Sequence, residues 1–123
     1  MNFKESKSIY LQIADRLMDE IVRRVYREDE RVPSVRDYAV TLEVNANTVA
    51  RSYEYLQQSE IIYNKRGLGY FVCPRAAERI LKLRRIVFLK DELPEFFRQM
   101  TLLGISVEEI VRYYAEFRET EHL

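Results

Sequence analysis

The sequence has 123 residues, 47% of them apolar and 33% charged, which suits one soluble globular domain with an appendage and is too short for two full domains. No apolar run approaches the ~18–20 residues that cross a bilayer, and Met1–Ser6 lacks the apolar core of a signal peptide, so we expect a cytoplasmic protein without membrane contact. The 20 basic and 20 acidic residues cancel and neither half is strongly basic, so any nucleic-acid contact must come from a local patch.

The first predicted helix covers residues 9–25, where an apolar side chain recurs at every fourth position. These positions are Ile9, Ile13, Leu17, Ile21 and Val25. Ser8 stands where it could cap the helix. Residues 26–32 are polar and predict a loop, with a very short strand at Arg31–Val32.

Two further helices follow, with a tight turn between them. Pro33–Ser34 restarts the helical pattern and predicts a short helix over about residues 35–42. After a turn at residues 43–46, a longer amphipathic helix is predicted over about residues 46–58. A short helix, a tight turn and a longer helix make a helix–turn–helix.

The pattern then changes from helix to strand. Residues 61–63 and 70–72 are β-branched and aromatic, and they flank a basic turn that contains glycine, which predicts a hairpin. The rest of the chain is helical again, in three apolar patterns separated near Pro94 and Gly104. We therefore predict a mainly α fold with a small β-hairpin: a winged helix–turn–helix domain over residues 1–74 and a short helical dimerisation tail over residues 75–123.

Polar side chains gather where a helix–turn–helix meets DNA. The second helix of the pair places its N-terminal residues at base edges in the major groove. The residues there are Asn45, Asn47, Thr48, Arg51 and Ser52. Asn can pair bidentately with adenine and Arg with guanine, while Thr and Ser can reach phosphates. The alternative is a solvated helix face on which Asn45 or Asn47 serves only as a cap.

Two more groups could bind the DNA backbone. Ser34 and Arg36 begin the shorter helix, whose N-terminus suits a phosphate, although Arg36 could instead pair with Asp37 or with the acidic residues 28–30. The hairpin tip is basic, and such a wing can enter the minor groove or touch its phosphates, although it could also be an ordinary exposed turn. The tip consists of Lys65, Arg66 and Gly67.

These motifs together resemble those of the GntR family of regulators. Ile9–Ala14 is similar to the family's PIYxQIA, Val32–Arg36 to LPSVR, Val44–Tyr53 to VNPNTVARAY, and Lys65–Val72 to RRGxGTFV. The resemblance spans about residues 8–73. It implies DNA contacts by Arg36, Asn47, Thr48, Arg51 and the Arg66–Gly67 pair, a homodimer that binds a double-stranded operator, and in most cases repression of transcription.

The length of the tail indicates a subgroup. Other GntR subgroups carry large effector-binding or aminotransferase-like domains, which about 50 residues cannot hold, whereas the YtrA-like subgroup carries a small helical dimerisation region. A small-molecule effector is common in the family, but this tail offers only helices, so we leave the effector unknown.

The chain departs from the family pattern at three glycines. Glu28–Pro33 stands where the family has PGDRLP, so Asp29 replaces a glycine, and Glu43 and Glu60 replace two more. A non-glycine residue in a left-handed conformation costs roughly 1–2 kcal/mol. Either these backbones shift, or the rest of the fold absorbs the strain.

The tail has more apolar surface than so short a segment can hide within itself. The apolar residues that we assign to a dimer interface are Leu83, Val87, Phe88, Phe96, Phe97, Met100, Tyr114 and Phe117. A second copy would bury them, and a two-fold dimer would read two half-sites about one helical turn apart. The alternative is that the tail packs back on its own winged domain.

Two other functions compete with DNA binding. A winged helix can serve as a protein-interaction module, and the neutral charge keeps that alternative open. An enzyme lacks support, because the sequence shows no acid–base pair, activated nucleophile or phosphate-binding loop. Cys73 and His122 are the only residues of their kinds, so we expect no catalytic residue, no metal site and no cofactor, with Cys73 in or beside a strand.

Overall fold

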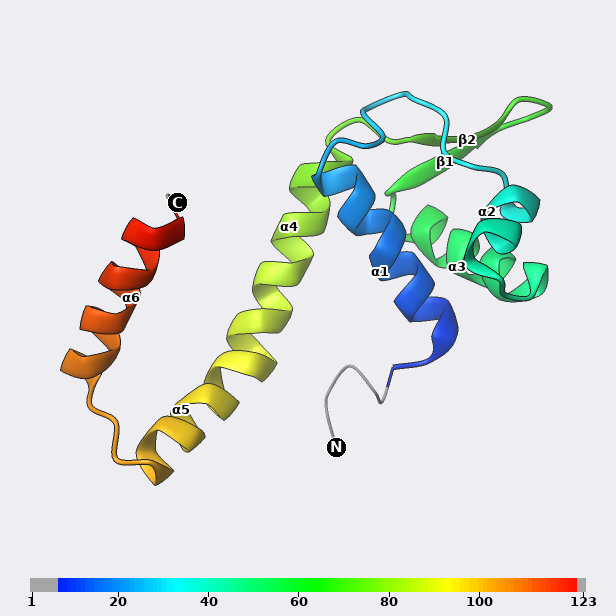
Figure 1. The fold of residues 1–123 in the computed structure, drawn as a ribbon. Helices are drawn as coiled ribbons and strands as arrows, with labels where there is room; N and C mark the ends of the chain where they lie inside the picture. Colours follow the sequence, from blue (N-terminus) through cyan, green and yellow to red (C-terminus); the bar gives the residue numbers. More distant parts are fainter. Residues whose placement is uncertain (1–6, 122–123) are drawn as a thin grey trace. The chain divides into compact units, whose positions relative to one another are not determined.

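The computed structural model describes residues 7–121, so the predictions for Met1–Ser6 and His122 lie outside it. It is mainly helical with one two-stranded antiparallel sheet, which confirms the predicted fold class (Figure 1). The elements are α1 (Ile9–Val22), α2 (Val35–Leu42), α3 (Ala46–Gln58), β1 (Ile62–Lys65), β2 (Gly69–Val72), α4 (Ala76–Val87), the π-helical turn η2 (Phe88–Glu92), α5 (Leu93–Leu102) and α6 (Val107–Glu121).

The chain divides into two compact units, one ending at Leu83 and the other beginning at Arg84. We name the first the winged unit and the second the tail, which from here on begins at Arg84 and not at residue 75. The division falls inside α4 because Ala76 and Ile80, in its first half, are buried in the core of the winged unit. The assignment of residues 1–74 to DNA binding and of residues 75–123 to dimerisation stays a prediction.

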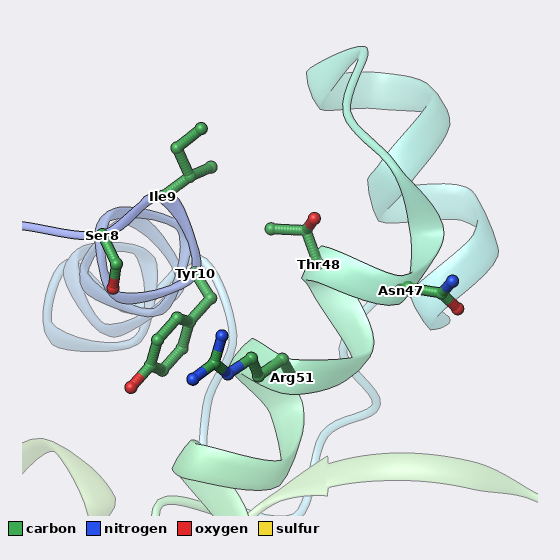
Figure 2. Close-up of a pocket in the computed structure, with 6 residues that line it drawn as sticks. All are labelled: Ser8, Ile9, Tyr10, Asn47, Thr48 and Arg51. Carbon is green, nitrogen blue, oxygen red and sulfur yellow. The ribbon is translucent and has the colours of Figure 1, made fainter.

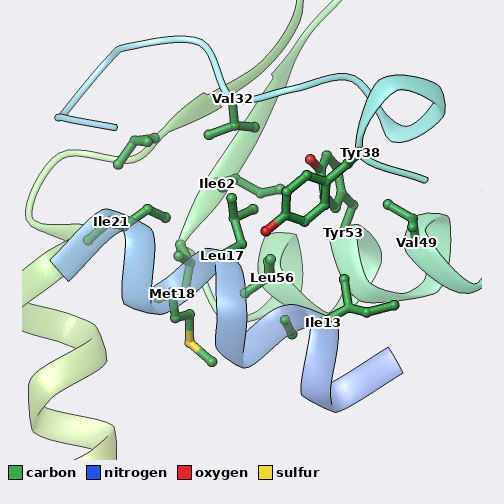
Figure 3. Close-up of a cluster of buried hydrophobic side chains, with 14 of the residues drawn as sticks. Ile13, Leu17, Met18, Ile21, Val32, Tyr38, Val49, Tyr53, Leu56 and Ile62 are labelled. Atoms are coloured by element: carbon green, nitrogen blue, oxygen red, sulfur yellow. The ribbon is translucent and has the colours of Figure 1, made fainter. Parts of the chain in front are cut away.

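The core of the winged unit forms where α1 packs against α3. Leu17 and Ile21 of α1 are buried, as are Tyr53 and Leu56 of α3, and Figure 3 shows these side chains as members of one buried cluster. Burying one such side chain contributes about 1.5–3 kcal/mol. This contact therefore fixes α3, the second helix of the helix–turn–helix, on the rest of the unit.

α1 is shorter than the apolar pattern predicts. The prediction that it reaches residue 25 is wrong, because Arg24 adopts a left-handed conformation with φ 64° and the helix ends at Val22. The Val25 amide donates to the Glu20 carbonyl oxygen at 2.8 Å, as in a Schellman motif. Ser8 occupies the N-cap position, but its side chain makes no capping hydrogen bond.

The three positions that lack the family's glycines keep the glycine conformation. Asp29, Glu43 and Glu60 have φ values of 62°, 56° and 60°. The backbone has therefore not shifted, and the fold absorbs the strain of three left-handed acidic residues.

Hydrogen bonds at the end of α3 show how the strain is absorbed. The Ile61 amide donates to the Leu56 carbonyl oxygen at 2.9 Å and the Glu60 amide to the Gln57 carbonyl oxygen at 3.0 Å, a Schellman pair. Arg79 of α4 adds a bond from Nη1 to the Glu60 carbonyl oxygen at 2.5 Å. Only backbone groups of Glu60 take part, so any residue that tolerates the conformation could stand there.

β1 and β2 form the predicted hairpin. Their register pairs Ile62 with Val72, Tyr63 with Phe71, Asn64 with Tyr70 and Lys65 with Gly69. A very short strand was predicted at residues 31–32; the structure has instead an isolated bridge from Arg31 to Phe71, and the Val32 amide donates to the Tyr70 carbonyl oxygen at 2.9 Å. The segment before α2 thus ties the hairpin to the helices. Cys73, half-buried, follows β2 directly.

Two buried tyrosines join the helix–turn–helix to its surroundings. The Tyr38 hydroxyl of α2 donates to Glu20 of α1, and the Tyr53 hydroxyl of α3 donates to the Pro33 carbonyl oxygen at 2.6 Å. Burial is the main cause that raises the pKa of both phenols above the ordinary value, and Glu20 raises both further. Both hydroxyls therefore remain protonated donors across the neutral range.

The tail begins without a loop. α4 passes through η2 directly into α5, and Pro94 lies at the start of α5, where a missing amide hydrogen is tolerated. Gly104, with φ 69°, follows the end of α5, as predicted. Ser106 caps α6 by accepting a hydrogen bond from the Glu109 amide at 3.1 Å. Within the described residues, no helix is both long and apolar enough to cross a membrane.

Candidate nucleic-acid interface

One stripe of α3 faces solvent. The buried residues Val49, Tyr53 and Leu56 line one side of the helix. Spacings of three and four residues place exposed side chains together on the other side. This stripe consists of Asn47, Arg51, Glu54 and Gln58, all exposed.

The two residues that precede α2 and α3 are helix caps. The Ser34 Oγ accepts a hydrogen bond from the Asp37 amide at 3.1 Å, and the Asn45 Oδ1 accepts one from the Asn47 amide at 2.7 Å. Each side chain thus satisfies one of the first-turn amides of its helix and leaves the others available. For Asn45, capping was the alternative to base contact, and the structure favours it.

The structure contradicts the prediction that Ser52 contacts DNA. Its side chain is fully buried, and its Oγ donates to the carbonyl oxygen of Tyr10 in α1 at 2.6 Å and lies 3.1 Å from the Thr48 carbonyl oxygen. The serine that sequence spacing placed at the edge of the polar face instead lies in the contact between α1 and α3.

Arg51 extends over an aromatic ring at the start of α1. Its guanidinium carbon lies 4.1 Å from the centre of the Tyr10 ring, within the range of a cation–π interaction. Figure 2 shows the Arg51 side chain directed from α3 toward Tyr10, whereas Asn47 points away from α1. The two helices enclose an open depression of about 370 Å³ here, lined by Ser8, Ile9, Tyr10, Asn47, Thr48 and Arg51.

Arg36 stands on the first turn of α2 with an exposed side chain. Within residues 7–121, no carboxylate forms an ion pair with it, so the alternative of pairing with Asp37 or with residues 28–30 finds no support. An exposed guanidinium at a helix start suits a phosphate oxygen.

The wing tip is a tight turn that presents two cations. The Leu68 amide donates to the Lys65 carbonyl oxygen at 2.8 Å, which leaves Arg66 and Gly67 at the corner. Gly67 has φ 79° and no atom within 4 Å of where a Cβ would stand, so it is required by backbone conformation rather than by crowding. The Lys65 Nζ lies 5.0 Å from the centre of the Phe71 ring, and the Arg66 side chain is exposed.

Sequence reasoning missed three residues near this face. Glu54 and Gln58 share the exposed stripe with Arg51 and could have been found from helical spacing alone. Tyr10 belongs to the Ile9–Ala14 motif, but the motif indicates no role for it, because its contact with Arg51 joins residues 41 positions apart. Within the described residues, no group of three or more metal-ligating side chains is arranged to hold an ion.

The apolar residues assigned to the dimer interface are open in a single copy. Leu83, Val87 and Phe88 remain between 42% and 48% exposed, and Phe96 and Phe97 are similarly open. Tyr114 and Phe117 of α6 are more than half exposed, and Met100 is half-buried. None of the described residues of η2, α5 or α6 is buried.

The helix–turn–helix and the wing coincide with a known family pattern. The model of the family described as bacterial regulatory proteins, gntR family, matches residues 9–72, from the start of α1 to the end of β2. This is more than half of the chain.

Similar proteins extend the match into the tail. The HTH-type transcriptional regulator YhcF of Bacillus subtilis is 34% identical over 117 residues, which cover 95% of each chain. The HTH-type transcriptional repressor YtrA of the same organism is 24% identical over 113 residues, 92% of this chain and 86% of that one. A crystal structure described as a GntR-family transcriptional regulator from Bacteroides thetaiotaomicron is 55% identical, covers 93% of this chain and 99% of that one, and superposes with a TM-score of 0.81.

These proteins are transcriptional regulators and not enzymes, and YtrA is among them. The regions matched in these three proteins cover 92–95% of this chain and so include both the winged unit and most of the tail. The chain is a DNA-binding transcriptional regulator and belongs to the GntR family.

Proposed function

We propose that the protein is a repressor that binds a palindromic operator as a homodimer, with α3 in the major groove and the wing at the minor groove or the backbone. The observation that carries this proposal is the exposed stripe of α3, on which Asn47 and Arg51 lie one turn apart. An Asn can read adenine and an Arg can read guanine at this spacing along a groove.

The remaining cations of the winged unit support the same orientation. Arg36 at the start of α2 and Arg66 at the wing tip are both exposed, and within residues 7–121 neither has an ion-pair partner. Phosphate contacts of this kind position a protein on the duplex without reading its sequence. We assign these two residues to phosphates, and Asn47, Thr48 and Arg51 to recognition.

The tail supports the homodimer. Its helices are amphipathic, yet in a single copy their apolar residues stay open, among them Val87, Phe88 and Phe97. Exposed apolar residues in such number favour an interaction site, and a two-fold pairing would present two α3 helices to two half-sites. The palindrome follows from that symmetry.

The repressor assignment rests on a relative. YtrA, named a transcriptional repressor, matches nearly the whole chain. A repressor acts by occupying its operator, which requires only the DNA contacts assigned above. With DNA as its partner, the expected location is the cytoplasm.

Selection of duplexes from a random pool by the full-length chain tests the proposal. We expect the selected sequences to contain an inverted repeat, and Arg51→Ala should weaken binding to the selected duplex by about 1–3 kcal/mol and relax the preference at one base pair of each half-site. Arg23→Ala provides a matched control, because it removes an exposed arginine at the opposite end of α1 from the depression. A chain that enriches no duplex would contradict the proposal and favour the protein-interaction alternative.

A further inference from the structure

Arg51 lies on an exposed face of α3, yet its side chain contacts the neighbouring helix α1. A free arginine side chain samples many rotamers, and fixing them costs up to about 2 kcal/mol. Here the guanidinium lies over the Tyr10 ring, with 4.1 Å between its central carbon and the ring centre. The stack limits the side chain to orientations that run along the start of α1 (Figure 2).

The stack leaves the donors of the guanidinium available. An arginine stacks through its flat face, whereas its N–H groups point outward from its edge. The bidentate pair with a guanine uses two of those edge donors. Tyr10 and a base can therefore engage Arg51 at the same time, one through its face and the other through its edge.

Tyr10 is itself held in place by α3. The buried Ser52 hydroxyl donates to the Tyr10 carbonyl oxygen at 2.6 Å, which fixes the backbone that carries the ring. The Tyr55 ring packs edge-on against the Tyr10 ring, with 6.4 Å between the ring centres and 76° between the planes. Three residues of α3 within positions 51–55 thus contact one residue of α1: Arg51, Ser52 and Tyr55.

We propose that Tyr10 is a positioning residue, whose ring holds the Arg51 guanidinium ready to read a base before DNA binds. This inference rests on the proposed function, in which Arg51 reads the operator. The physical basis is preorganisation, because a side chain that is already ordered loses less entropy when it binds. Ser52, which does not reach DNA, would serve recognition indirectly by fixing the backbone at Tyr10.

The contact can be tested without DNA. Arg51 side-chain protons that lie over an aromatic face should show upfield ring-current shifts in the NMR spectrum of the full-length chain. Tyr10→Leu, which keeps apolar volume but removes the ring, should abolish the shifts, while Tyr10→Phe should preserve them. Unchanged Arg51 shifts in Tyr10→Leu would overturn the proposal, because the ring would not be holding the side chain.

The role in recognition requires a double-mutant cycle on a duplex selected by the full-length chain. We expect Tyr10→Leu to weaken binding about three- to tenfold when Arg51 is present, with the loss concentrated at the base pair whose preference Arg51→Ala relaxes. In the Arg51→Ala background the same substitution should change affinity less than twofold. Tyr10→Phe should bind like the unchanged chain.

The outcomes separate this proposal from the proposed function. If Tyr10→Leu weakens binding equally in both Arg51 backgrounds, or equally on all duplexes, Tyr10 contributes to general folding or phosphate contact and the positioning role is overturned while DNA recognition stands. If Arg51→Ala leaves binding to the selected duplex unchanged, Arg51 reads no base and the positioning role fails with it. If no duplex is selected, both proposals fail.

Discussion

The winged unit and the tail use the same kind of amphipathic helix with opposite results. In the winged unit the apolar stripes of α1 and α3 are buried against each other, with Leu17 and Leu56 fully inaccessible. In the tail, α5 and α6 carry stripes of similar spacing, yet none of their described residues is buried. The comparison teaches that an apolar stripe specifies a face to be buried but not what buries it: in the winged unit another helix of the same chain does so, and for the tail we propose a second copy.

The exposed faces of the winged unit and of the tail differ in polarity. The open stripe of α3 is polar and includes Asn47 and Arg51, whereas the open stripes of the tail are aromatic and aliphatic, with Phe97 half exposed. A polar, partly cationic face suits a nucleic acid, and an apolar face suits a protein surface. We therefore expect substitutions in the two units to separate folding, self-association and DNA binding.

The largest difference should come from the same substitution placed in each unit. Leu56→Ala removes a fully buried side chain, and we expect the free energy of unfolding of the winged unit to fall by about 3 kcal/mol. Leu102→Ala removes a side chain that is 85% exposed, and should change stability by less than about 0.5 kcal/mol. Urea denaturation followed by circular dichroism measures both.

A large loss of stability in Leu102→Ala would break the comparison, because it would mean that the tail is buried against something in the single copy. An equal, small effect of both substitutions would mean that the core of the winged unit is not formed as Figure 3 shows it.

The next largest effect should appear in self-association. Phe97→Glu places a charge in the apolar stripe of α5, and we expect the dimer dissociation constant to rise about 100-fold, since burying an unpaired charge in an interface costs about 2–4 kcal/mol. Gln99→Glu adds the same charge on the opposite side of the helix and should leave the dimer intact. Sedimentation at micromolar concentration distinguishes dimer from monomer.

A monomer in the unchanged chain would contradict the tail's assignment directly. A dimer that survives Phe97→Glu and dissociates with Gln99→Glu would show that the interface uses the other face of α5.

Most of the winged unit could be predicted from the sequence, because helix caps and apolar spacing indicate the same boundaries there. α2 and α3 have the predicted bounds, since a capping residue begins each helix and the apolar spacing sets the length. The end of α1 was predicted wrongly, because Val25 continues the apolar spacing although Arg24 adopts a left-handed backbone conformation that ends the helix. No side-chain pattern marks that turn, and an arginine is not the residue expected in it.

The candidate site was predicted less well, and two residues show why. Helical spacing places Ser52 at the edge of the polar face, and whether such a residue is exposed depends on the neighbouring helix. Here α1 covers it, and the Ser52 hydroxyl bonds to a backbone 42 residues away. The role of Tyr10 depends on the same long-range contact. Periodicity identifies the centre of a helix face, but tertiary packing decides its edges.

Substitutions in the wing should change DNA binding without changing the stability of the winged unit or the self-association of the tail. Arg66→Ala removes an exposed cation at the tip of the hairpin, and we expect it to weaken binding by about 1 kcal/mol on all duplexes and to reduce the salt slope by about one unit, as the loss of one phosphate contact requires. Leu68→Ala, at an exposed neighbour in the same turn, should change neither. Binding measured from low to moderate salt gives both values, and an effect confined to one operator sequence would contradict the phosphate role.

The smallest effect concerns the left-handed residues that only the winged unit carries in place of the family's glycines. Glu60 has φ 60°, so Glu60→Gly should relieve strain and stabilise the winged unit by about 0.5–1 kcal/mol. The hydrogen bonds at this position involve backbone groups of Glu60, including the carbonyl oxygen bound by Arg79, and the substitution preserves them. The urea midpoint of the full-length chain should therefore rise.

Glu54→Gly is the control for Glu60→Gly, because the two substitutions should shift the urea midpoint in opposite directions. Glu54 is exposed in the interior of α3, where a glycine destabilises a helix by about 0.5–1 kcal/mol. The same chemical change, six residues apart, should thus raise the urea midpoint at Glu60 and lower it at Glu54. If both substitutions lowered the urea midpoint, the Glu60 side chain would stabilise the end of α3 by more than its left-handed backbone costs. The chain would then be more stable with an acidic residue at a position where its family has glycine.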